Sequence, residues 1–178
     1  KPPTSKSTVL ADKVVEQPLG RPNDLVVDRH VGIYFTDPGR GTVCYRHADG
    51  DVSQFNDGIK RPNGVILSPD EQTLYVIPSG QPQMMAYPIT APSKLGKPRV
   101  LCTIEQLKAQ SNTGGDGATV DTEGNLYIAT RAGIQVFDPQ GKTLSIIRHA
   151  GFNYPKHPAN VTFGGEDRRT LFITARDA

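Results

Sequence analysis

Residues 21–38 read RPNDLVVDRHVGIYFTDP, and this stretch decides the fold. The polar Asn23 is followed by the apolar run Leu25–Val27, and ten residues after Asn23 a second apolar cluster begins, Ile33–Thr36. Turn formers lie between the two runs, from Asp28 to Gly32. Short runs of β-branched and aromatic residues on either side of such a turn are typical of paired strands. The stretch therefore predicts a β-hairpin.

The same pattern recurs three more times along the chain, at residues 61–76, 115–129 and 158–174. Each copy begins with a polar Asn or Asp and has its second apolar cluster ten to twelve residues later. We call these first polar residues the anchors: Asn23, Asn63, Asp116 and Asn160, separated by 40, 53 and 44 residues. A repeat of this length is close to that of a propeller blade of four antiparallel strands.

Weaker strand signals after the hairpins complete the predicted blades. Val43–Arg46 and Ile134–Phe137 follow two of the hairpins, and each is followed by a turn that contains Gly. We therefore predict an all-β fold, with residues 1–178 forming a single β-propeller domain to which this chain contributes roughly four blades. Because an open arc leaves two apolar faces in water, we expect the rest of the ring to come from residues outside this sequence or from another chain.

Two segments depart from the repeat. Thr103–Gln110 has helical periodicity and lies where the longest spacing between anchors demands an insertion, so we predict a short helix on an outer connection. Thr8–Leu10 and Val14–Val15 are predicted to be outer strands of a blade whose inner strands are missing.

The composition excludes several classes of partner. The net charge of +2 gives no long-range field that would concentrate nucleic acid or an anionic membrane, so neither partner is expected. No apolar run is long enough to span a membrane, and the first six residues lack the apolar centre of a secretion signal, which leaves the compartment open. Cys44 and Cys102 form no metal-binding or redox motif, so we expect packing roles for both, with a disulfide between them as the alternative.

The anchors are candidate metal ligands. In a propeller, equivalent positions before successive inner strands converge on one mouth of the central channel. Asn23, Asn63, Asn160 and Asp116 would supply three amide oxygens and one carboxylate there. Such all-oxygen sets favour calcium, with zinc, manganese and magnesium as alternatives. The competing reading is that each anchor caps a turn by bonding the nearby backbone.

The motifs resemble those of the regucalcin (senescence marker protein) and gluconolactonase family. Residues 21–38 and 61–71 are similar to two successive signatures of that family, 115–127 to a third and 160–165 to a fourth, in the same order. The resemblance implies a six-bladed propeller that opens lactones beside one divalent cation. Its ligands would be Asn23, Asn63, Asp116 and an early glutamate that has no counterpart in this sequence.

The resemblance also implies roles for residues around the cation. Asp116 would activate the attacking water, and a small-molecule lactone would be bound by Arg21, Asn23 and Asn160. For Arg21 the alternative is a surface arginine before Pro22 that binds no substrate. Asp37 is a further substrate-binding candidate, with closure of the turn before Pro38 as the alternative. Two other functions stay open: a propeller that only binds a partner, and a related hydrolase of phosphotriesters or other esters.

Overall fold

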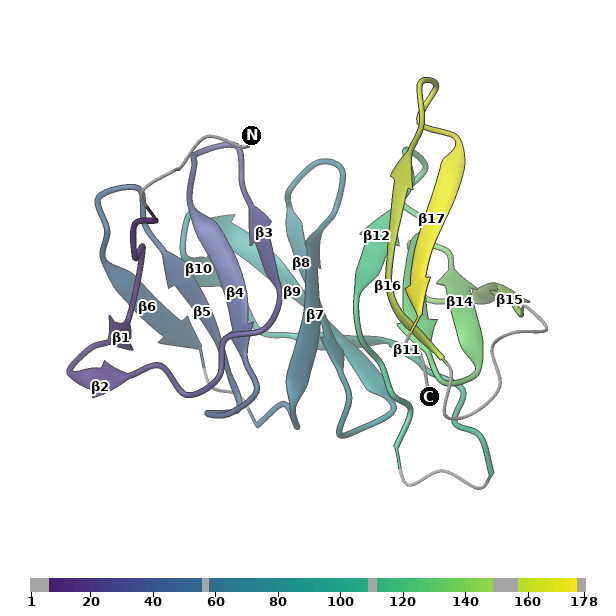
Figure 1. The fold of residues 1–178 in the computed structure, drawn as a ribbon, viewed down its shortest axis with the longest axis horizontal. Helices are drawn as coiled ribbons and strands as arrows, with labels where there is room; N and C mark the ends of the chain where they lie inside the picture. The colour runs from purple at the N-terminus through teal and green to yellow at the C-terminus, as the bar shows by residue number, and fades with distance from the viewer. Residues whose placement is uncertain (1–6, 56–57, 109–111, 149–156, 176–178) are drawn as a thin grey trace.

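The computed structural model describes residues 7–55, 58–108, 112–148 and 157–175, which form antiparallel β-sheets arranged side by side (Figure 1). These residues contain no helix, and hence none that could cross a membrane. The all-β prediction is confirmed, and in the first and third sheets consecutive strands pair in chain order, as in a propeller blade.

The strands group into sheets that follow the sequence repeats. The first sheet contains β3 (Leu25–Val27), β4 (Ile33–Asp37), β5 (Thr42–Arg46) and β6 (Val52–Phe55). The second contains β7 (Pro62–Leu67), β8 (Thr73–Pro78) and β9 (Gln83–Ala91), with β10 (Lys94–Leu95) and β11 (Arg99–Thr103) both paired to β9. The third contains β12 (Ala118–Val120), β13 (Leu126–Thr130), β14 (Gly133–Phe137) and β15 (Thr143–Ile147). The fourth is the hairpin of β16 (Pro158–Gly164) and β17 (Thr170–Ala175).

The four predicted hairpins are the pairs β3–β4, β7–β8, β12–β13 and β16–β17, and all are antiparallel. Side chains at their turns satisfy backbone amides, which is why Asp recurs there. Asp28 accepts bonds from the amides of His30 (2.8 Å) and Gly32 (2.9 Å). Asp121 does the same for Glu123 and Asn125, at 2.9 and 2.8 Å. Local turn chemistry thus fixes each hairpin.

The core lies between successive sheets. One buried cluster joins the first and second sheets and includes Tyr34, Val65 and Leu74. Another joins the second and third sheets and includes Ile77, Ile104 and Ile128. A smaller cluster joins the third sheet to the β16–β17 hairpin: Ala129, Ile134 and Val161. Face-to-face burial between neighbouring sheets is what holds an arc of blades together.

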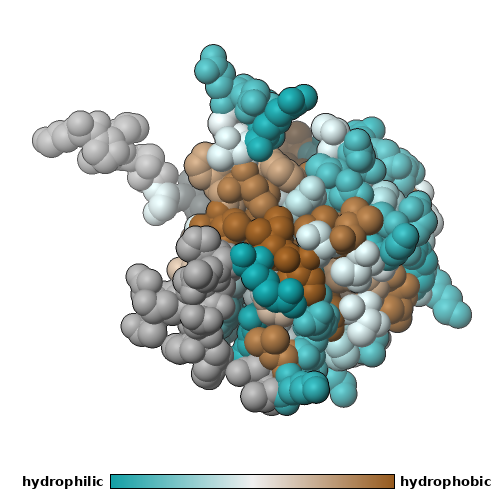
Figure 2. All heavy atoms as spheres, turned by 90° about the vertical axis from the view of Figure 1, so that its right-hand side faces the viewer, coloured by the Kyte–Doolittle hydropathy of each residue, from teal (hydrophilic) through white to brown (hydrophobic). Residues whose placement is uncertain are grey.

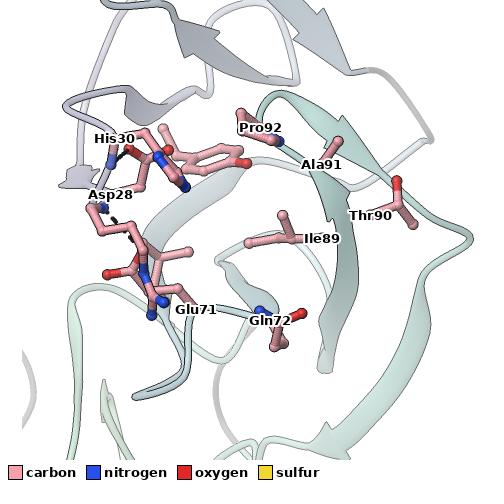
Figure 3. A pocket seen from close by; sticks show the side chains of 11 residues that line it. Asp28, His30, Glu71, Gln72, Ile89, Thr90, Ala91 and Pro92 are labelled. Atoms are coloured by element: carbon pink, nitrogen blue, oxygen red, sulfur yellow. Dashed lines mark hydrogen bonds and ion pairs between the residues drawn. The ribbon is translucent and has the colours of Figure 1, made fainter.

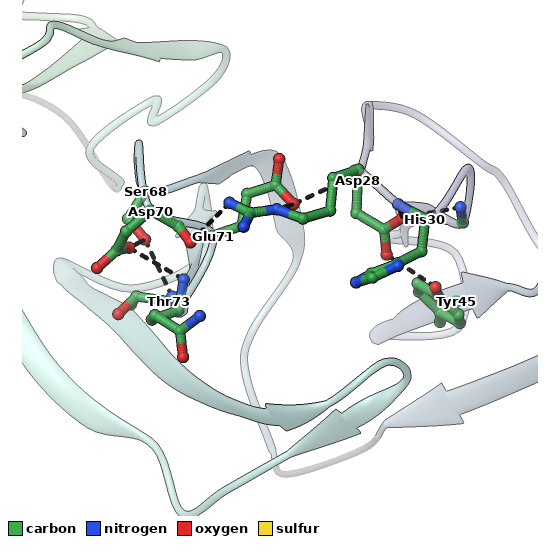
Figure 4. Close-up of polar contacts among 10 residues, drawn as sticks. Asp28, His30, Tyr45, Ser68, Asp70, Glu71 and Thr73 are labelled. Atoms are coloured by element: carbon green, nitrogen blue, oxygen red, sulfur yellow. Dashed lines mark hydrogen bonds and ion pairs between the residues drawn. The ribbon is translucent and has the colours of Figure 1, made fainter.

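Polar bonds also join the first two sheets at the hairpin turns (Figure 4). Glu71 accepts from the Arg29 amide at 3.0 Å and from its Nε at 2.9 Å, while the Arg29 guanidinium donates to the Asp70 carbonyl at 2.9 Å. Behind this contact the buried Tyr45 hydroxyl donates to Asp28 at 2.8 Å. These turns lie at the opposite ends of the strands from the anchors.

The predicted helix at Thr103–Gln110 is wrong for the residues described, and positions 109–110 lie outside them. Thr103 ends strand β11, and the segment that follows is irregular. Ile104 is buried, and its amide donates to the Pro82 carbonyl at 2.8 Å. The Gln135 side chain bonds both the amide (2.8 Å) and the carbonyl (3.0 Å) of Glu105. Tertiary partners therefore take the backbone groups that a helix would have used.

The predicted outer strands near the start are only partly present. Thr8–Leu10 forms no strand, and Val9 and Leu10 are 76% and 56% exposed. Strand β1 covers Lys13–Val14 and pairs with β2 (Gln17–Pro18) around a tight turn in which Val15 has a φ of 54°. Val15 is therefore a turn residue. The alternation of apolar residues here was too short to specify a longer strand.

Both cysteines are buried free thiols, so the packing role is confirmed and the disulfide alternative is excluded. Cys44 lies on β5 of the first sheet and Cys102 on β11 of the second. Burial raises the pKa of Cys102 to about 12.

Apolar side chains stay exposed on the side of the molecule that carries β15 and β17. Figure 2 shows a hydrophobic patch on this side. Leu144 is 51% exposed, Ile147 37% and Phe172 53%. Apolar side chains of β15 and β17 are therefore less well covered on this side than those between sheets.

Candidate functional site

The anchors lie at the same end of the inner strands, where each chain segment enters its hairpin. Asn23 and Asp116 lie two residues before β3 and β12 begin, and Asn63 and Asn160 lie within β7 and β16. In both of these longer strands the pairing register shifts at the anchor, between Pro62 and Gly64 and between Pro158 and Asn160. Such irregularities redirect a side chain relative to a regular strand.

The structure brings the first three anchors together. The Asn23 amide donates to Oδ1 of Asn63, across 40 residues of sequence. The Asn63 amide in turn donates to the Gly115 carbonyl at 3.1 Å, which adjoins Asp116. Asn63 is thus the central member of the group, with a side-chain or main-chain partner from each neighbouring blade.

Glycines next to the anchors allow this close approach. A Cβ on Gly64 would lie 2.2 Å from the Asp116 carbonyl oxygen, which no side chain could tolerate. A Cβ on Gly117 would lie 2.2 Å from the Asn160 side-chain oxygen, and the Gly117 amide donates to the Ala159 carbonyl at 2.9 Å. Asp116 and Asn160 are therefore adjacent through Gly117. All four predicted anchors lie in one continuous row.

Asp24 was not predicted as a site residue, yet its side chain connects two neighbouring blades at the row of anchors. Its carboxylate accepts from the Val65 amide at 3.0 Å, which joins the first and second blades beside Asn63. Burial raises the pKa of Asp24, although the bonds from Val65 and Leu25 act in the opposite direction. The sequence signal was present in the contrast between the motifs Arg-Pro-Asn-Asp and Arg-Pro-Asn-Gly, because only the first carries a carboxylate after its anchor.

A cavity of about 400 Å³ opens along the inner strands of all four sheets. Its lining combines apolar side chains, such as Val65, with polar ones. The polar side chains include Asp24, Thr119, Asn160, Thr162 and Thr174. The volume falls within the usual range for small-molecule sites, roughly 300–1,000 Å³. Asn160 lines this cavity, and its Oδ1 accepts from the Val161 amide at 2.8 Å.

Asp37 is fully buried, and its carboxylate bonds three backbone amides. Gly20 and Arg21 donate to it at 2.6 Å each, and Arg40 at 3.2 Å. These bonds support the turn-closing alternative for Asp37 and hold the segment that leads to the first anchor. The Arg21 side chain is exposed, so its guanidinium can reach a molecule outside the fold.

The donor chemistry of the row fits a hard cation. Asn23, Asn63 and Asp116 offer amide, carboxylate and backbone carbonyl oxygens, the ligand types that calcium accepts. Within the residues described, His, Cys, Asp and Glu form no cluster of three that could hold a metal by themselves. The amide-rich composition therefore fits calcium better than zinc.

A second cavity, of about 160 Å³, lies at the hairpin-turn end between the first two sheets (Figure 3). It is lined by Asp28, His30, Glu71 and Gln72, together with Ile89 to Pro92. None of the predicted site residues borders it. The row of anchors at the other end of the strands remains the candidate site.

The sequence and the fold are both similar to known lactonases. A gluconolactonase from Zymomonas mobilis is 30% identical over 193 aligned positions, which cover 98% of this chain and 53% of that protein. The solved structure of a gluconolactonase from Xanthomonas campestris has a TM-score of 0.79 and 29% identity, covering 95% of this chain and 59% of the other. A calcium-binding regucalcin from Agrobacterium tumefaciens has a TM-score of 0.71 at 22% identity, covering 86% and 52%, and so supports the fold alone.

The chain spans about half the length of these curated relatives. Residues 1–177 match the family described as SMP-30/Gluconolactonase/LRE-like region, which confirms the resemblance that the motifs indicated. The chain belongs to the SMP-30/gluconolactonase/LRE-like family.

Proposed function

We propose that the protein containing this chain is a metal-dependent hydrolase that opens the ester bond of a sugar lactone or similar small lactone. The observation that carries the proposal is the junction of Asn23, Asn63 and the Gly115 carbonyl at the entrance to three inner strands, with Asp116 next in sequence. The similarity to a gluconolactonase over 98% of the chain supports the same reaction class.

Asn23, Asn63 and Asp116 would hold one divalent cation, with calcium the first candidate. When bound, such a cation polarises the carbonyl of the lactone and stabilises negative charge on its oxygen. The contacts between blades hold the Asn23 and Asn63 side chains, and they place the main chain beside Asp116, before any ligand arrives. Preorganised groups of this kind do not have to be reoriented during the reaction.

Asp116 would also accept the proton of the attacking water. It is the one carboxylate among the anchors, and its side chain is partly exposed, so water can reach it. Asn160 would contact the lactone from the cavity wall, which it lines together with Thr119, Thr162 and Thr174. Arg21 would contact the hydroxyl groups of the substrate from the rim, because a guanidinium offers several donors.

Further blades would complete the ring and supply a second acidic ligand. The exposed apolar side chains Leu144, Ile147 and Phe172 support this part of the proposal, because they offer a surface that another blade can bury. A glutamate from such a segment would balance the charge of the dication better than Asp116 alone. Residues outside this sequence are the first candidate for these blades, and another chain is the alternative.

The test follows proton release during hydrolysis of gluconolactone, with and without a chelator. We expect activity to disappear on chelation, to return on addition of calcium, and to fall at least about 100-fold in Asp116→Ala. Asp49→Asn is the matched control, because Asp49 is an exposed turn carboxylate that bonds only the Asp51 amide among the contacts described, at 3.1 Å. Full activity after chelation would exclude the proposed chemistry. Hydrolysis of a phosphotriester without hydrolysis of lactones would move the proposal to the related esterase class.

A further inference from the structure

Thr36 makes hydrogen bonds that connect two neighbouring blades at the row of anchors. Its side chain lies on β4 and is fully buried. The hydroxyl donates to the Asn63 carbonyl at 2.6 Å and accepts from the Asp24 amide at 3.2 Å. One hydroxyl group thus touches the main chain of the central anchor and the main chain beside the first anchor.

Asn63 lies at an irregularity of its strand, so the placement of its main chain depends on this contact. The register shift between Pro62 and Gly64 leaves Asn63 without a paired residue on β8. Its carbonyl is instead bound by Thr36, while two residues later the Val65 amide is bound by the Asp24 carboxylate. The irregular stretch around Asn63 is therefore held on both sides by the neighbouring blade.

The hydroxyl is not a general requirement of these hairpins. Thr36 exchanges backbone bonds with the segment before β3. The backbone amide of Asn23 donates to the Thr36 carbonyl, and the backbone amide of Thr36 donates to the Asp24 carbonyl. Ala129 makes the same two bonds with Asp116 and Gly117 in the third sheet, without any side-chain hydroxyl. The hairpin geometry can therefore form with alanine at this position, and the hydroxyl at Thr36 has another role.

We propose that Thr36 is a positioning residue, which directs the side-chain amide of Asn63 toward Asn23 and the Gly115 carbonyl. The inference rests on the proposed function in so far as Asn63 is a ligand of the cation. The Thr36 hydroxyl bonds the main chain on both sides, so it would act through Asn63 and not on the cation or substrate directly. Residues that orient ligands in this way commonly change metal affinity 10- to 100-fold when they are replaced.

The experiment compares Thr36→Val, Thr36→Ser and Thr130→Val. Valine keeps the shape of the side chain but removes both bonds, and serine keeps the hydroxyl. Thr130 is the matched control, because it is equally buried and its hydroxyl bonds Gly133, Ala132 and Gln135, away from the anchors. The first measurement is the NMR signals of the Asn63 side-chain amide, assigned by their loss in Asn63→Ala.

We expect the Asn63 signals to move in Thr36→Val and to stay in place in Thr36→Ser and Thr130→Val. Calcium titration should then give an affinity about 10-fold weaker in Thr36→Val, and within about twofold of wild type in the other two variants. Unchanged Asn63 signals in Thr36→Val would overturn the inference, as would equal displacement in Thr130→Val. If the Asn63 signals respond as expected but the wild type binds no calcium, the positioning role stands and the proposed function fails.

Discussion

Replacing Asp37 with asparagine should destabilise the fold strongly, because its carboxylate is fully buried and bonds the amides of Gly20, Arg21 and Arg40. Asparagine offers one acceptor oxygen, so at least one amide would face an NH₂ group. The other bonds would change from charged to neutral. A hydrogen bond to a charged group contributes about 1.5–3 kcal/mol, so we expect a loss of about 3 kcal/mol in the free energy of unfolding.

For a chain of this length that loss corresponds to a fall in Tm of about 6–12 °C. The assay is thermal and urea unfolding followed by circular dichroism, with Asp49→Asn as the control, expected to stay within about 0.5 kcal/mol of wild type. The comparison also decides between the two readings of Asp37. If Asp37→Asn were as stable as Asp49→Asn but raised KM for the lactone, the turn-closing argument would be refuted and substrate binding supported.

Three further outcomes follow from contacts elsewhere in the structure. Glu71→Gln breaks the ion pair between Glu71, whose side chain is 26% exposed, and Arg29, whose side chain is 54% exposed. Urea unfolding should show a loss of about 0.5–1 kcal/mol in the free energy of unfolding, and this loss should shrink at high salt. A loss that does not depend on salt would contradict the electrostatic origin. The Ser68 hydroxyl donates to the Asp70 carboxylate at 2.6 Å and is the main cause of the lowered pKa of that carboxyl. This bond stabilises the fold above the pKa of Asp70 in the unfolded chain, and the stabilisation is lost as pH falls through the lower pKa of the folded state. Ser68→Ala should therefore move the NMR titration of Asp70 to higher pH, and an unmoved titration would assign the effect to other bonds. Burial raises the pKa of Cys102 to about 12, so its thiol should react with a disulfide reagent at pH 8 only when the protein unfolds; fast reaction of the native protein would disprove that protection.

The hairpins could be predicted from the sequence because their determinants are local. Asp28 and Asp121 bond amides two and four residues away, so the turn is specified by a short stretch of chain. The alternation of apolar residues on either side then fixes which face of each strand is buried. The repeat of this unit was sufficient to predict an arc of blades.

The segment after β11 could not be predicted in this way because its partners are distant. Its sequence has the periodicity of a short helix, but Gln135 lies 30 residues from Glu105 and bonds both its backbone groups. Propensity for a short helix is weak enough for two such bonds and the burial of Ile104 to override it.

The arrangement of the anchors in the candidate site was predictable, but its supporting contacts were not. The equivalent places of the anchors in the repeat indicated that they would meet at one end of the inner strands. Which backbone groups would join the blades depends on register, and hence on the irregular pairing around Asn63 and Asn160. The extra carboxylate of Asp24 is visible in its motif, but its partner Val65 follows from that register, and so does the bond of Thr36 to Asn63.

Asn23 and Asn63 are held by bonds between blades, and this links the candidate site to the packing of the sheets. Val65 shows the connection most directly: its side chain is buried in the cluster between the first two sheets, while its amide bonds Asp24 beside the anchors. A loss of packing at this cluster would therefore loosen the contact between Asn23 and Asn63 without any change to either residue. Substitutions in the inter-sheet core should therefore weaken binding of the proposed cation before they unfold the chain.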